Sequence, residues 1–563
     1  MSVSVTAAAV AAAAAAAHAI RFTRPYVNGK WWPLPVTTTG TTIGTTIGTA
    51  TTTTTAPTWL SASASALQPY SIRCPSTETH LTTIQANVPG DIDSIVASAR
   101  SALNAGPWGT AEWTGVRRRH ENTCLHIALK SFFPITLHAL NAIADLIHTH
   151  SDHFAWLETL TGKPTTQSYE DIHACEHTLR YFASHADQIN GRTYAFDAQF
   201  DSYTLKEPIG VCGLITSFNY PLLLAIWKIA PALAAGNTVI IKPAPQTPLS
   251  TLYLAQVIHE AGILPPGVFN VVLGGADIGQ ALALHSDVNL ISFTGSSHVG
   301  RLVAISCAQA SPPHKCMLEL GGKNCVIVCA DAELDLAVES VVDAAFANMG
   351  QNCCAASRLL LHRDIHDEFL TMLKKRTEAL VIGDPFDKKT SQGPLIDQRQ
   401  FESVSKFIEL ANATDAIRVI SGGGRVGPIG YFLQPMILSG VPDNSPLATD
   451  EIFGPILSVL QPLSLFIVLP LCVCAIPFDT IEEAVARANK SAHGLAAGVW
   501  TNNLKWMQFA TRRLNVGMVW QNYYNDIPPY LPLGGRKQSG YGTDLGIETL
   551  EAMMVTKSVH SAR

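Results

Sequence analysis

Short apolar runs alternate with longer helical patterns between residues 209 and 300, and this alternation restricts the chain to few folds. Residues 221–235 are small and apolar, as in a buried helix, whereas residues 247–261 carry a polar face and end at Gly262. Apolar runs of strand length flank these helices, so the pattern predicts an α/β fold with a parallel sheet, of the kind that binds dinucleotides. The four strand candidates are residues 211–217, 238–241, 268–273 and 289–293.

A glycine-rich turn follows the last of these strands. It reads Gly295-Ser296-Ser297-His298-Val299-Gly300 and precedes a helical pattern. A helix N-terminus carries partial positive charge, so backbone amides in such a turn can bind a pyrophosphate. The usual phosphate-binding fingerprint is absent, and a tight connection without a ligand is the alternative.

The composition excludes several classes of protein. The 563 residues suggest roughly three or four structural units, and 47% apolar residues can fill their cores, which excludes a small disulfide scaffold. With 38 basic and 44 acidic residues, the formal net charge is −6. The chain therefore lacks the positive surface of a nucleic-acid-binding protein, and we expect a small-molecule partner and no nucleic acid.

The cysteines point to a reducing compartment. They include no repeated CxxC pair, and Cys325 and Cys329 lie in apolar runs where reduced core thiols are favoured over disulfides or a metal site. We expect no metal and a cytoplasmic protein. Residues 1–21 contain an alanine run that no basic residue precedes, so we expect a disordered leader and not a secretory signal. No acidic residue precedes Glu78, as in transit peptides, which makes mitochondrial import the alternative.

Three segments interrupt the globular pattern. Residues 37–58 are rich in threonine and cannot bury a core, so we expect a disordered loop. Residues 120–139 separate three arginines from an amphipathic pattern. Residues 462–476 lie in a charge-free stretch long enough to span a bilayer, although prolines oppose a continuous helix. We expect the last two segments to be foreign to the fold, as translated introns would be. A membrane hairpin is the less favoured alternative.

A cysteine pair carries the most distinctive chemistry. At Gly350-Gln351-Asn352-Cys353-Cys354 a pattern rich in alanine and valine ends, and small neighbours leave space for a substrate beside the thiol. Glu319 ends an apolar strand and is a candidate base. A thiol needs a base or a lowered pKa to attack, because only the thiolate is nucleophilic.

At these residues the chain resembles the aldehyde dehydrogenase superfamily, from about Tyr26 to Val559 apart from the three interruptions. The motifs that carry the resemblance occur in the family's order, and chance agreement across all of them is negligible. They are Ser217-Phe218-Asn219-Tyr220-Pro221, Lys242-Pro243-Ala244, Phe293-Thr294-Gly295-Ser296, Glu319-Leu320-Gly321-Gly322-Lys323, Gly350-Gln351-Asn352-Cys353, Glu451-Ile452-Phe453-Gly454-Pro455 and Gly534-Gly535-Arg536-Lys537-Gln538-Ser539-Gly540.

The resemblance implies oxidation of an aldehyde to a carboxylic acid through a thiohemiacetal and a thioester. Cys353 would be the nucleophile, with Cys354 its neighbour. The side-chain amide of Asn219 and the backbone N–H of Cys353 would hold the oxyanion, and Glu319 would serve the hydrolysis of the thioester. Lys228 would lie near the reacting centre. A structural role is the alternative for Lys228, a salt bridge beside a helix is the alternative for Glu319, and an Asx turn is the alternative for Asn219.

The resemblance also implies NAD or NADP as cofactor. Lys242 would contact the adenosine ribose, Glu451 the nicotinamide ribose and Phe453 the nicotinamide face, although Phe453 can equally be core. Where NAD-preferring members commonly have a glutamate, three residues after the lysine, this chain has Pro245, which makes NADP a serious possibility. The other residues expected to line the cofactor cleft are Phe218, Gly275, Gly295, Ser296 and Gln400. A purely structural role is the alternative for Gly275 and Gln400.

The implied architecture has two Rossmann-like parallel-sheet domains and a bridging strand segment that joins subunits. We expect the cofactor-binding domain at 22–189 and 209–321, the catalytic domain at 322–544, and the oligomerisation segment at 190–208 and 545–563. Exposed strand edges need partners, so a homodimer or a homotetramer is expected.

The substrate aldehyde is not determined by the sequence. An aromatic tunnel would accept either a cationic amino-aldehyde or an aryl aldehyde. A second hypothesis is that the chain keeps the fold without turnover, because of the interrupting segments. The candidates for the tunnel are Phe218, Trp520, Tyr523, Tyr524 and Tyr530, and for each of them ordinary core is the favoured alternative.

Overall fold

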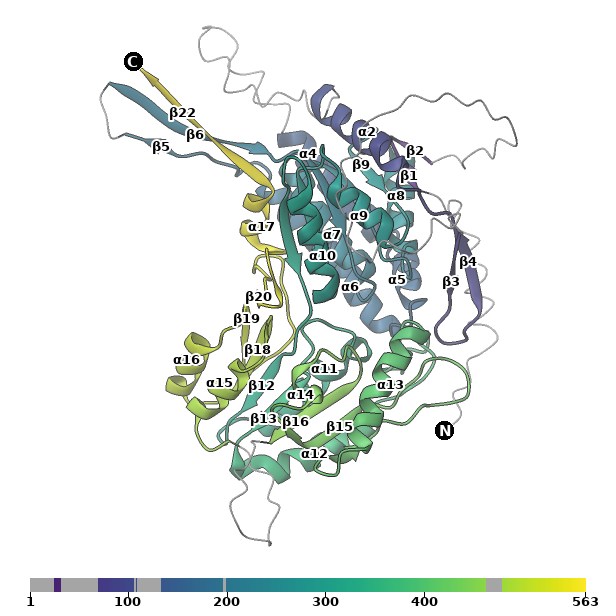
Figure 1. Cartoon of the computed structure of the whole chain (residues 1–563), viewed down its shortest axis with the longest axis vertical. Coiled ribbons are helices and arrows are strands. Elements are labelled where there is room, and N and C mark those ends of the chain that lie inside the picture. Colours follow the sequence, from purple (N-terminus) through teal and green to yellow (C-terminus); the bar gives the residue numbers. More distant parts are fainter. Residues whose placement is uncertain are drawn as a thin grey trace, which may run out of the picture.

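The structure, a computed structural model, consists of two bodies and an arm (Figure 1). No helix in the described part of the chain is both long and apolar enough to cross a bilayer. The predicted leader 1–21, the loop 37–58, residues 120–132 and residues 462–476 all lie outside the described residues. The described residues are 25–31, 69–105, 108, 133–195, 199–461 and 478–562.

The first body is built on an eight-stranded sheet in the order β2-β1-β9-β8-β7-β10-β11-β21. The strands from β9 to β11 run parallel, and β1 and β21 join them antiparallel at either side. This confirms the predicted parallel sheet and its four strands. The bounds are β1 Tyr26–Val27, β2 Lys30–Trp31, β7 Val211–Ile215, β8 Thr238–Lys242, β9 Phe269–Val271, β10 Leu290–Thr294, β11 Lys315–Glu319 and β21 Gly540–Tyr541.

Helices cover both faces of this sheet, which is why its strands are apolar throughout. In β8, Val239 and Ile241 face one buried cluster, whereas Ile240 faces another. On one face lie α2 (Asp91–Ala105), α9 (Ala276–Leu284) and α10 (Ser297–Gln309). On the other lie α4 (Phe133–Thr149), α5 (Ser151–Thr159), α6 (Thr165–His185), α7 (Pro221–Ala234) and α8 (Leu249–Ala261).

Helix α7 is buried on every side, as its small and apolar sequence predicted. Pro221 occupies its first turn, where the missing N–H has no intrahelical partner to lose. The helix lies between the sheet and helices α4 and α6, so that it fixes the chain on its N-terminal side, residues 217–220. This places Asn219 at the carboxyl end of β7.

The second body is a seven-stranded sheet in the order β14-β15-β16-β13-β12-β18-β19, parallel except at β14. Its strands are β12 Cys325–Val328, β13 Arg358–Leu361, β14 Arg418–Ser421, β15 Met436–Pro442, β16 Ile456–Gln461, β18 Ala496–Trp500 and β19 Met518–Gln521. Its helices are α11 Leu334–Phe346, α12 His366–Glu378, α13 Gln398–Asn412, α14 Pro446–Thr449, α15 Ile481–Asn489 and α16 Leu504–Arg513, with 3₁₀ turns at Ala347–Gly350 (η4) and Arg363–Ile365 (η5).

The arm is a three-stranded antiparallel sheet that extends from the first body (Figure 1). Its strands are β5 (Thr193–Tyr194), β6 (Phe200–Pro208) and β22 (Met554–Ala562), and α17 (Gly546–Ala552) precedes the last of them. Most of β22 is exposed, although strands normally need partners on both edges. Two small sheets complete the fold: β3 (Tyr70–Arg73) with β4 (His80–Ile84), and β17 (His493–Gly494) with β20 (Arg536–Lys537).

The structure differs from two expected boundaries. Helix α4 begins at Phe133, and Thr136 and Ala139 are buried, so 133–139 belong to the fold and the end expected for the segment 120–139 is too late. The boundary was predicted too late because Pro134 suggests a break in the helix, although proline is tolerated in a first helical turn. Strand β21 falls within 322–544 but pairs with β11 of the first body, because the chain crosses back between the bodies.

The register of the second sheet locates an insertion point. Arg358 pairs with Ser458 and Leu359 with Val459, so continuing this parallel register would place residue 462 opposite His362. Phe478 takes that place instead: its N–H donates to Leu361 O, and its carbonyl accepts from Arg363 N. Phe478 therefore occupies the sheet position that would directly follow Gln461.

We predict that deleting residues 462–477 leaves the fold intact, because Gln461 would then run into Phe478 in unbroken register. The melting temperature should stay within about 5 °C of that of the full chain, measured by circular dichroism. As a control, deleting residues 456–461 removes β16 and should abolish folding. An unfolded product from the first deletion would contradict the assigned register.

Candidate active site

Two cavities meet at Cys353. One, of about 230 Å³, lies between the two bodies, and the other, of about 690 Å³, opens along α6, α7 and α11. Cys353 lines both, as do Leu224, Trp227 and Leu533. The smaller cavity brings together most of the predicted site residues: Phe218, Asn219, Gly295, Ser296, Glu319, Cys353, Gln400, Glu451 and Phe453.

Cys353 follows a turn with an unusual backbone. Asn348, Met349 and Gly350 have φ values of 50°, 58° and 70°, all in the left-handed region. A Cβ at Gly350 would lie 2.3 Å from Gly454 O, so only glycine fits there. The turn leaves Cys353 half-buried between the cavities, and its backbone N–H donates to no group in the described residues.

The neighbouring thiol is in a different environment. Cys354 is fully buried, and a contact with the Cys353 thiol together with burial raises its pKa well above the ordinary value. Its backbone carbonyl accepts a hydrogen bond from the Tyr524 hydroxyl at 2.9 Å. Cys354 is therefore a core residue, and the accessible thiol of the pair is Cys353.

Asn219 faces the same cavity from the end of β7. It is 6% exposed, its Oδ1 is buried without a partner, and its Nδ2 makes no hydrogen bond among the described residues. An amide in this state can donate to a ligand oxygen. No Asx turn explains the side chain, because neither of its polar atoms contacts the local backbone.

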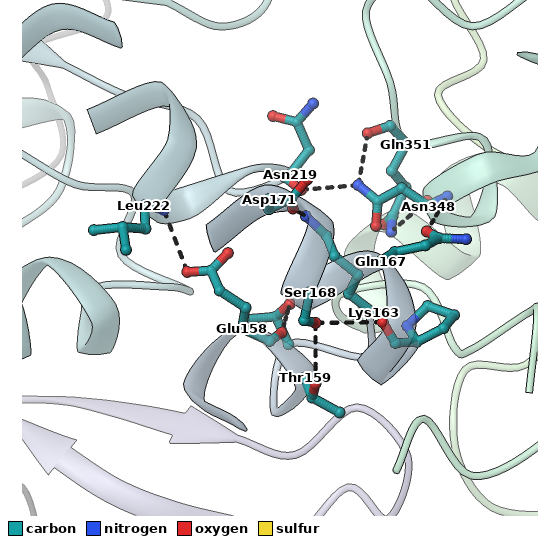
Figure 2. A network of polar contacts seen from close by, with 12 residues as sticks. Glu158, Thr159, Lys163, Gln167, Ser168, Asp171, Asn219, Leu222, Asn348 and Gln351 are labelled. Carbon is teal, nitrogen blue, oxygen red and sulfur yellow. Dashed lines mark hydrogen bonds and ion pairs between the residues drawn. The ribbon is translucent and has the colours of Figure 1, made fainter. Parts of the chain in front are cut away.

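A hydrogen-bond network joins the Asn219 loop to the Cys353 turn (Figure 2). Asn348 Nδ2 donates to Asn219 O at 2.8 Å and to Gln351 O at 3.2 Å. The backbone N–H of Asn348 donates to Gln167 Oε1 of α6 at 3.0 Å. Asn348 thus links the two bodies beside the site, a role that the sequence analysis missed. A polar residue such as Asn348, close before a Gly-Gln pair, does not by itself predict a link of this kind.

A buried acid supports the same loop from below. The Glu158 carboxylate accepts from Leu222 N at 3.2 Å and so satisfies an N–H in the first turn of α7. Burial raises the pKa of Glu158 to about 7. Lys163 forms a buried ion pair with Asp171 (Figure 2). The Lys163 Nζ also lies 4.0 Å from the centre of the Tyr220 ring.

Glu319 ends β11 at the cavity wall. It is 7% exposed and its Oε1 has no partner. Burial, and then the nearby Asp544 carboxylate, raise the pKa of Glu319 well above its usual range, while Lys228 acts in the opposite direction. A carboxylate with a raised pKa is a stronger proton acceptor once it is ionised.

Lys228 lines neither cavity, but its ion pair with Asp544 lies close enough to Glu319 to act on the pKa of that acid. Its Nζ donates to Asp544 Oδ2 at 2.8 Å, to Asp544 Oδ1 at 3.0 Å and to Ser292 Oγ at 3.0 Å. Asp544, not Lys228, lines the smaller cavity. The sequence analysis gave Asp544 no role. A lysine in an otherwise apolar helix was the available signal that a buried carboxylate must exist.

The far side of the smaller cavity contains Glu451 and Phe453. Glu451 Oε1 accepts from Gly322 N at 3.0 Å, and burial raises its pKa to about 7. The Phe453 ring meets Phe218 edge-on at 5.7 Å between centroids, so Phe218 belongs to this cavity and not to the other. Gln400 Nε2 donates to Phe453 O at 2.9 Å and thereby holds the backbone beneath the ring.

Two helix N-termini follow the strands of the first sheet. Gly275 caps α9, and Ser296 caps α10 by accepting from Val299 N. Lys242 and Gly275 lie outside both cavities, and the Lys242 side chain runs beside Gly279 of α9. Its Nζ has a single long contact, to Pro243 O at 3.5 Å, and burial lowers its pKa to about 8. An amino group beside the first turns of α9 fits the ribose and pyrophosphate of a dinucleotide.

Only some of the aromatic residues expected in the tunnel line the larger cavity. Tyr523 and Tyr524 line it, but Trp520 and Tyr530 do not. Trp520 is core, with Nε1 donating to Asp526 O at 2.8 Å, and Tyr530 is 63% exposed. Aromatic residues two strands or loops apart cannot be assigned to one wall from their order in the sequence alone.

Comparison with known proteins gives consistent matches. The model of the Aldehyde dehydrogenase family matches residues 136–465 and 467–559, with its break inside the segment 462–476. The mitochondrial aldehyde dehydrogenase of Homo sapiens is 40% identical over 472 residues, or 83% of this chain and 84% of that protein. Retinaldehyde dehydrogenase 3 of Homo sapiens is 40% identical over 489 residues, or 86% and 88%.

Solved structures agree with these matches. An NAD⁺ complex of an aldehyde dehydrogenase from Bacillus cereus superposes with a TM-score of 0.82 at 32% identity, and the alignment covers 100% of both chains. Betaine aldehyde dehydrogenase from Staphylococcus aureus, in complex with NAD⁺, gives a TM-score of 0.80 at 29% identity over 96% of this chain and 94% of that one.

The geometry predicts different reactivity for the two adjacent thiols. Iodoacetamide should alkylate Cys353 at least about tenfold faster than Cys354, because a buried thiol with a raised pKa provides little thiolate. Mass spectrometry of the peptide over a time course would measure both rates. Cys354→Ala should keep the fast phase and Cys353→Ala should lose it. Fast labelling that survives in Cys353→Ala would contradict the assignment.

Proposed function

The chain belongs to the aldehyde dehydrogenase family, and on that premise we propose which residues perform each step of its reaction. The protein is an NAD(P)-dependent aldehyde dehydrogenase that oxidises an aldehyde to the carboxylic acid through a cysteine thiohemiacetal and a thioester. One observation carries the proposal: Cys353 lies where the two cavities meet, with Asn219 and Glu319 on the walls of the smaller one.

In the first step the Cys353 thiolate adds to the aldehyde carbon. The carbonyl oxygen becomes an oxyanion, which needs donors that are already in place. The Asn219 amide and the free backbone N–H of Cys353 are such donors, and each is worth about 10²- to 10³-fold in rate. Asn348 is a positioning residue, because it bonds the backbone of the Asn219 loop to the turn before Cys353.

NAD(P)⁺, when bound, supplies the acceptor for the hydride that leaves the substrate carbon. Glu451 and Phe453 would hold its nicotinamide ribose and ring, Ser296 and Gly295 its pyrophosphate, and Lys242 and Gly275 its adenosine end. Phe218 and Gln400 support Phe453 by ring packing and by a backbone hydrogen bond.

In the last step Glu319 removes a proton from the water that hydrolyses the thioester. The unpartnered Oε1 of Glu319 is free to accept that proton. Burial, and then the charge of Asp544, which Lys228 holds, disfavour the charged form of Glu319, so the base becomes more effective as the pH rises. This assigns Lys228 and Asp544 the task of setting the basicity of Glu319. The hypothesis of a fold without turnover loses its support, since Cys353, Asn219 and Glu319 all face one cavity.

Two broader proposals follow from the arm and from the thiols. The exposed edge of β22 suits pairing with a second copy, which supports a homodimer or a homotetramer. The free cysteines of the described residues, most of them buried, support a reducing compartment. That compartment would be the cytoplasm, with mitochondria as the alternative that the names of several relatives favour.

The order of chemistry is testable with two variants. Glu319→Gln should retain a stoichiometric burst of reduced cofactor but lose about 10²- to 10⁴-fold in steady turnover, because hydride transfer precedes hydrolysis. Because the pKa of Glu319 is raised, the wild-type turnover should still rise with pH above the usual titration range of a carboxylate, and the variant should lose this rise. Stopped-flow absorbance measures both phases. Cys353→Ala should lose both, and turnover in that variant would refute the mechanism.

Cofactor choice depends on the missing carboxylate at Pro245. NADP⁺ should be used with an efficiency within roughly tenfold of that for NAD⁺, a difference of about 1.4 kcal/mol. Pro245→Glu should shift the ratio towards NAD⁺, because a carboxylate repels a 2′-phosphate and binds ribose hydroxyls. The ratio of kcat/KM values measures the effect. A preference of the unmodified protein for NAD⁺ above about a hundredfold would rule this out.

A further inference from the structure

The larger cavity, which opens onto Cys353, has walls of one charge sign. Its lining includes Glu170 and Asp171 of α6, Asp343 of α11 and Asp526 after β19, but no lysine, arginine or histidine. A cavity lined by one sign of charge raises the local concentration of ligands of the opposite sign. The cavity therefore discriminates among aldehydes by charge.

Only one of these carboxylates is neutralised within the protein. Asp171 forms the buried ion pair with Lys163. Glu170, Asp343 and Asp526 are exposed, and their side chains accept no hydrogen bond and form no ion pair among the described residues. Glu170 of α6 and Asp343 of α11 line the same cavity, and burial, then the charge of Asp171, then that of Asp343 raise the pKa of Glu170.

The charged groups packed around this pair do not cancel it. Arg376 lies nearest to Asp343 but is bonded to Glu339 at 3.0 Å, and Lys163 is already paired with Asp171. The mouth of the cavity therefore keeps a net negative charge. A substrate that carries a positive charge would reduce the repulsion between Glu170 and Asp343, whereas a neutral aromatic group would displace water from them without compensation.

We infer that the preferred substrates are aldehydes that carry an ammonium group, with the cation at the acidic mouth and the carbonyl at Cys353. The inference rests on the proposed role of Cys353. The aromatic walls suit the same cation, since Trp227 and Tyr523 present rings along the route. The structure thus favours the first of the two substrate classes left open by the sequence.

The overall reaction conserves atoms and electrons: R–CHO, NAD(P)⁺ and H₂O give R–COO⁻, NAD(P)H and two protons. The aldehyde carbon loses a hydride to the cofactor and gains an oxygen from water. The product is then a carboxylate beside a negatively charged cavity. Like-charge repulsion weakens its binding there, so the same residues that attract the substrate assist the release of the product.

A pair of aldehydes of equal shape tests the inference. Trimethylammonioacetaldehyde and 3,3-dimethylbutanal differ by a nitrogen cation in place of a carbon. We expect kcat/KM to favour the cation by at least about tenfold at low salt, and the ratio to fall between about 20 mM and about 300 mM NaCl. Succinate semialdehyde should be a poorer substrate than pentanal. A ratio near one, or a preference for the neutral aldehyde, would overturn the inference.

Variants locate the effect. Glu170→Gln combined with Asp343→Asn should lower the cation preference by about fivefold or more, through a higher KM for the cationic aldehyde. Asp335→Asn removes an exposed acid from the first turn of the same helix α11, outside the cavity, and should leave the preference as it was. An equal loss in both variants would refute the assignment to the cavity mouth.

The substrate preference and the proposed function can be rejected separately. Turnover of neutral aldehydes without a cation preference would reject this inference and leave the role of Cys353 intact. An absence of turnover with every aldehyde, together with a folded protein by circular dichroism, would reject the proposed function and this inference with it.

Discussion

The strained turn at Asn348, Met349 and Gly350 is the constraint on which the site depends. Left-handed backbone at a residue other than glycine costs on the order of 1 kcal/mol, and two such residues stand side by side here. The hydrogen bonds of Asn348 to both flanking loops hold it in place. Because the turn joins α6 and the Asn219 loop to the sheet that carries Cys353, the nucleophile and its oxyanion donor keep a fixed separation.

A second constraint is electrostatic. Within the described part of the chain, Lys228 is the only cation that contacts Asp544, the carboxylate near Glu319. Lys228 is buried, and its Nζ is held by Asp544 and Ser292. Breaking such a pair leaves an uncompensated buried charge. The site therefore places Glu319, whose ionisation is disfavoured, beside the Lys228–Asp544 pair, which must stay ionised. Because the pair acts on Glu319, a change that disrupts it alters both the stability of the fold and the basicity of Glu319.

The sequence predicted local structure and motifs better than contacts between residues that are far apart in the chain. The strands and helices of 209–300 follow from apolar patterning, and Cys353, Glu319 and Asn219 from motifs that the structure gathers around one cavity. Lys228 was expected near the reacting centre, but the sequence could not reveal that it acts through Asp544, a partner 316 positions further along the chain. Trp520 is core, as was the favoured alternative for each tunnel candidate, and Tyr530 is exposed, because aromatic content does not reveal which wall a ring faces. The start of α4 at Phe133 was not predicted, because a proline can either interrupt a helix or occupy its first turn.

The register of β16 has a consequence for how the protein can be altered. The strand starts just after Glu451 and Gly454, beside the smaller cavity, and ends at Gln461. Six extended residues span about 20 Å, so the junction between Gln461 and Phe478 is separated from the reacting thiol by the length of a whole strand. Guest peptides, such as an affinity tag or a fluorescent reporter, can thus be grafted at this junction while the catalytic groups remain undisturbed.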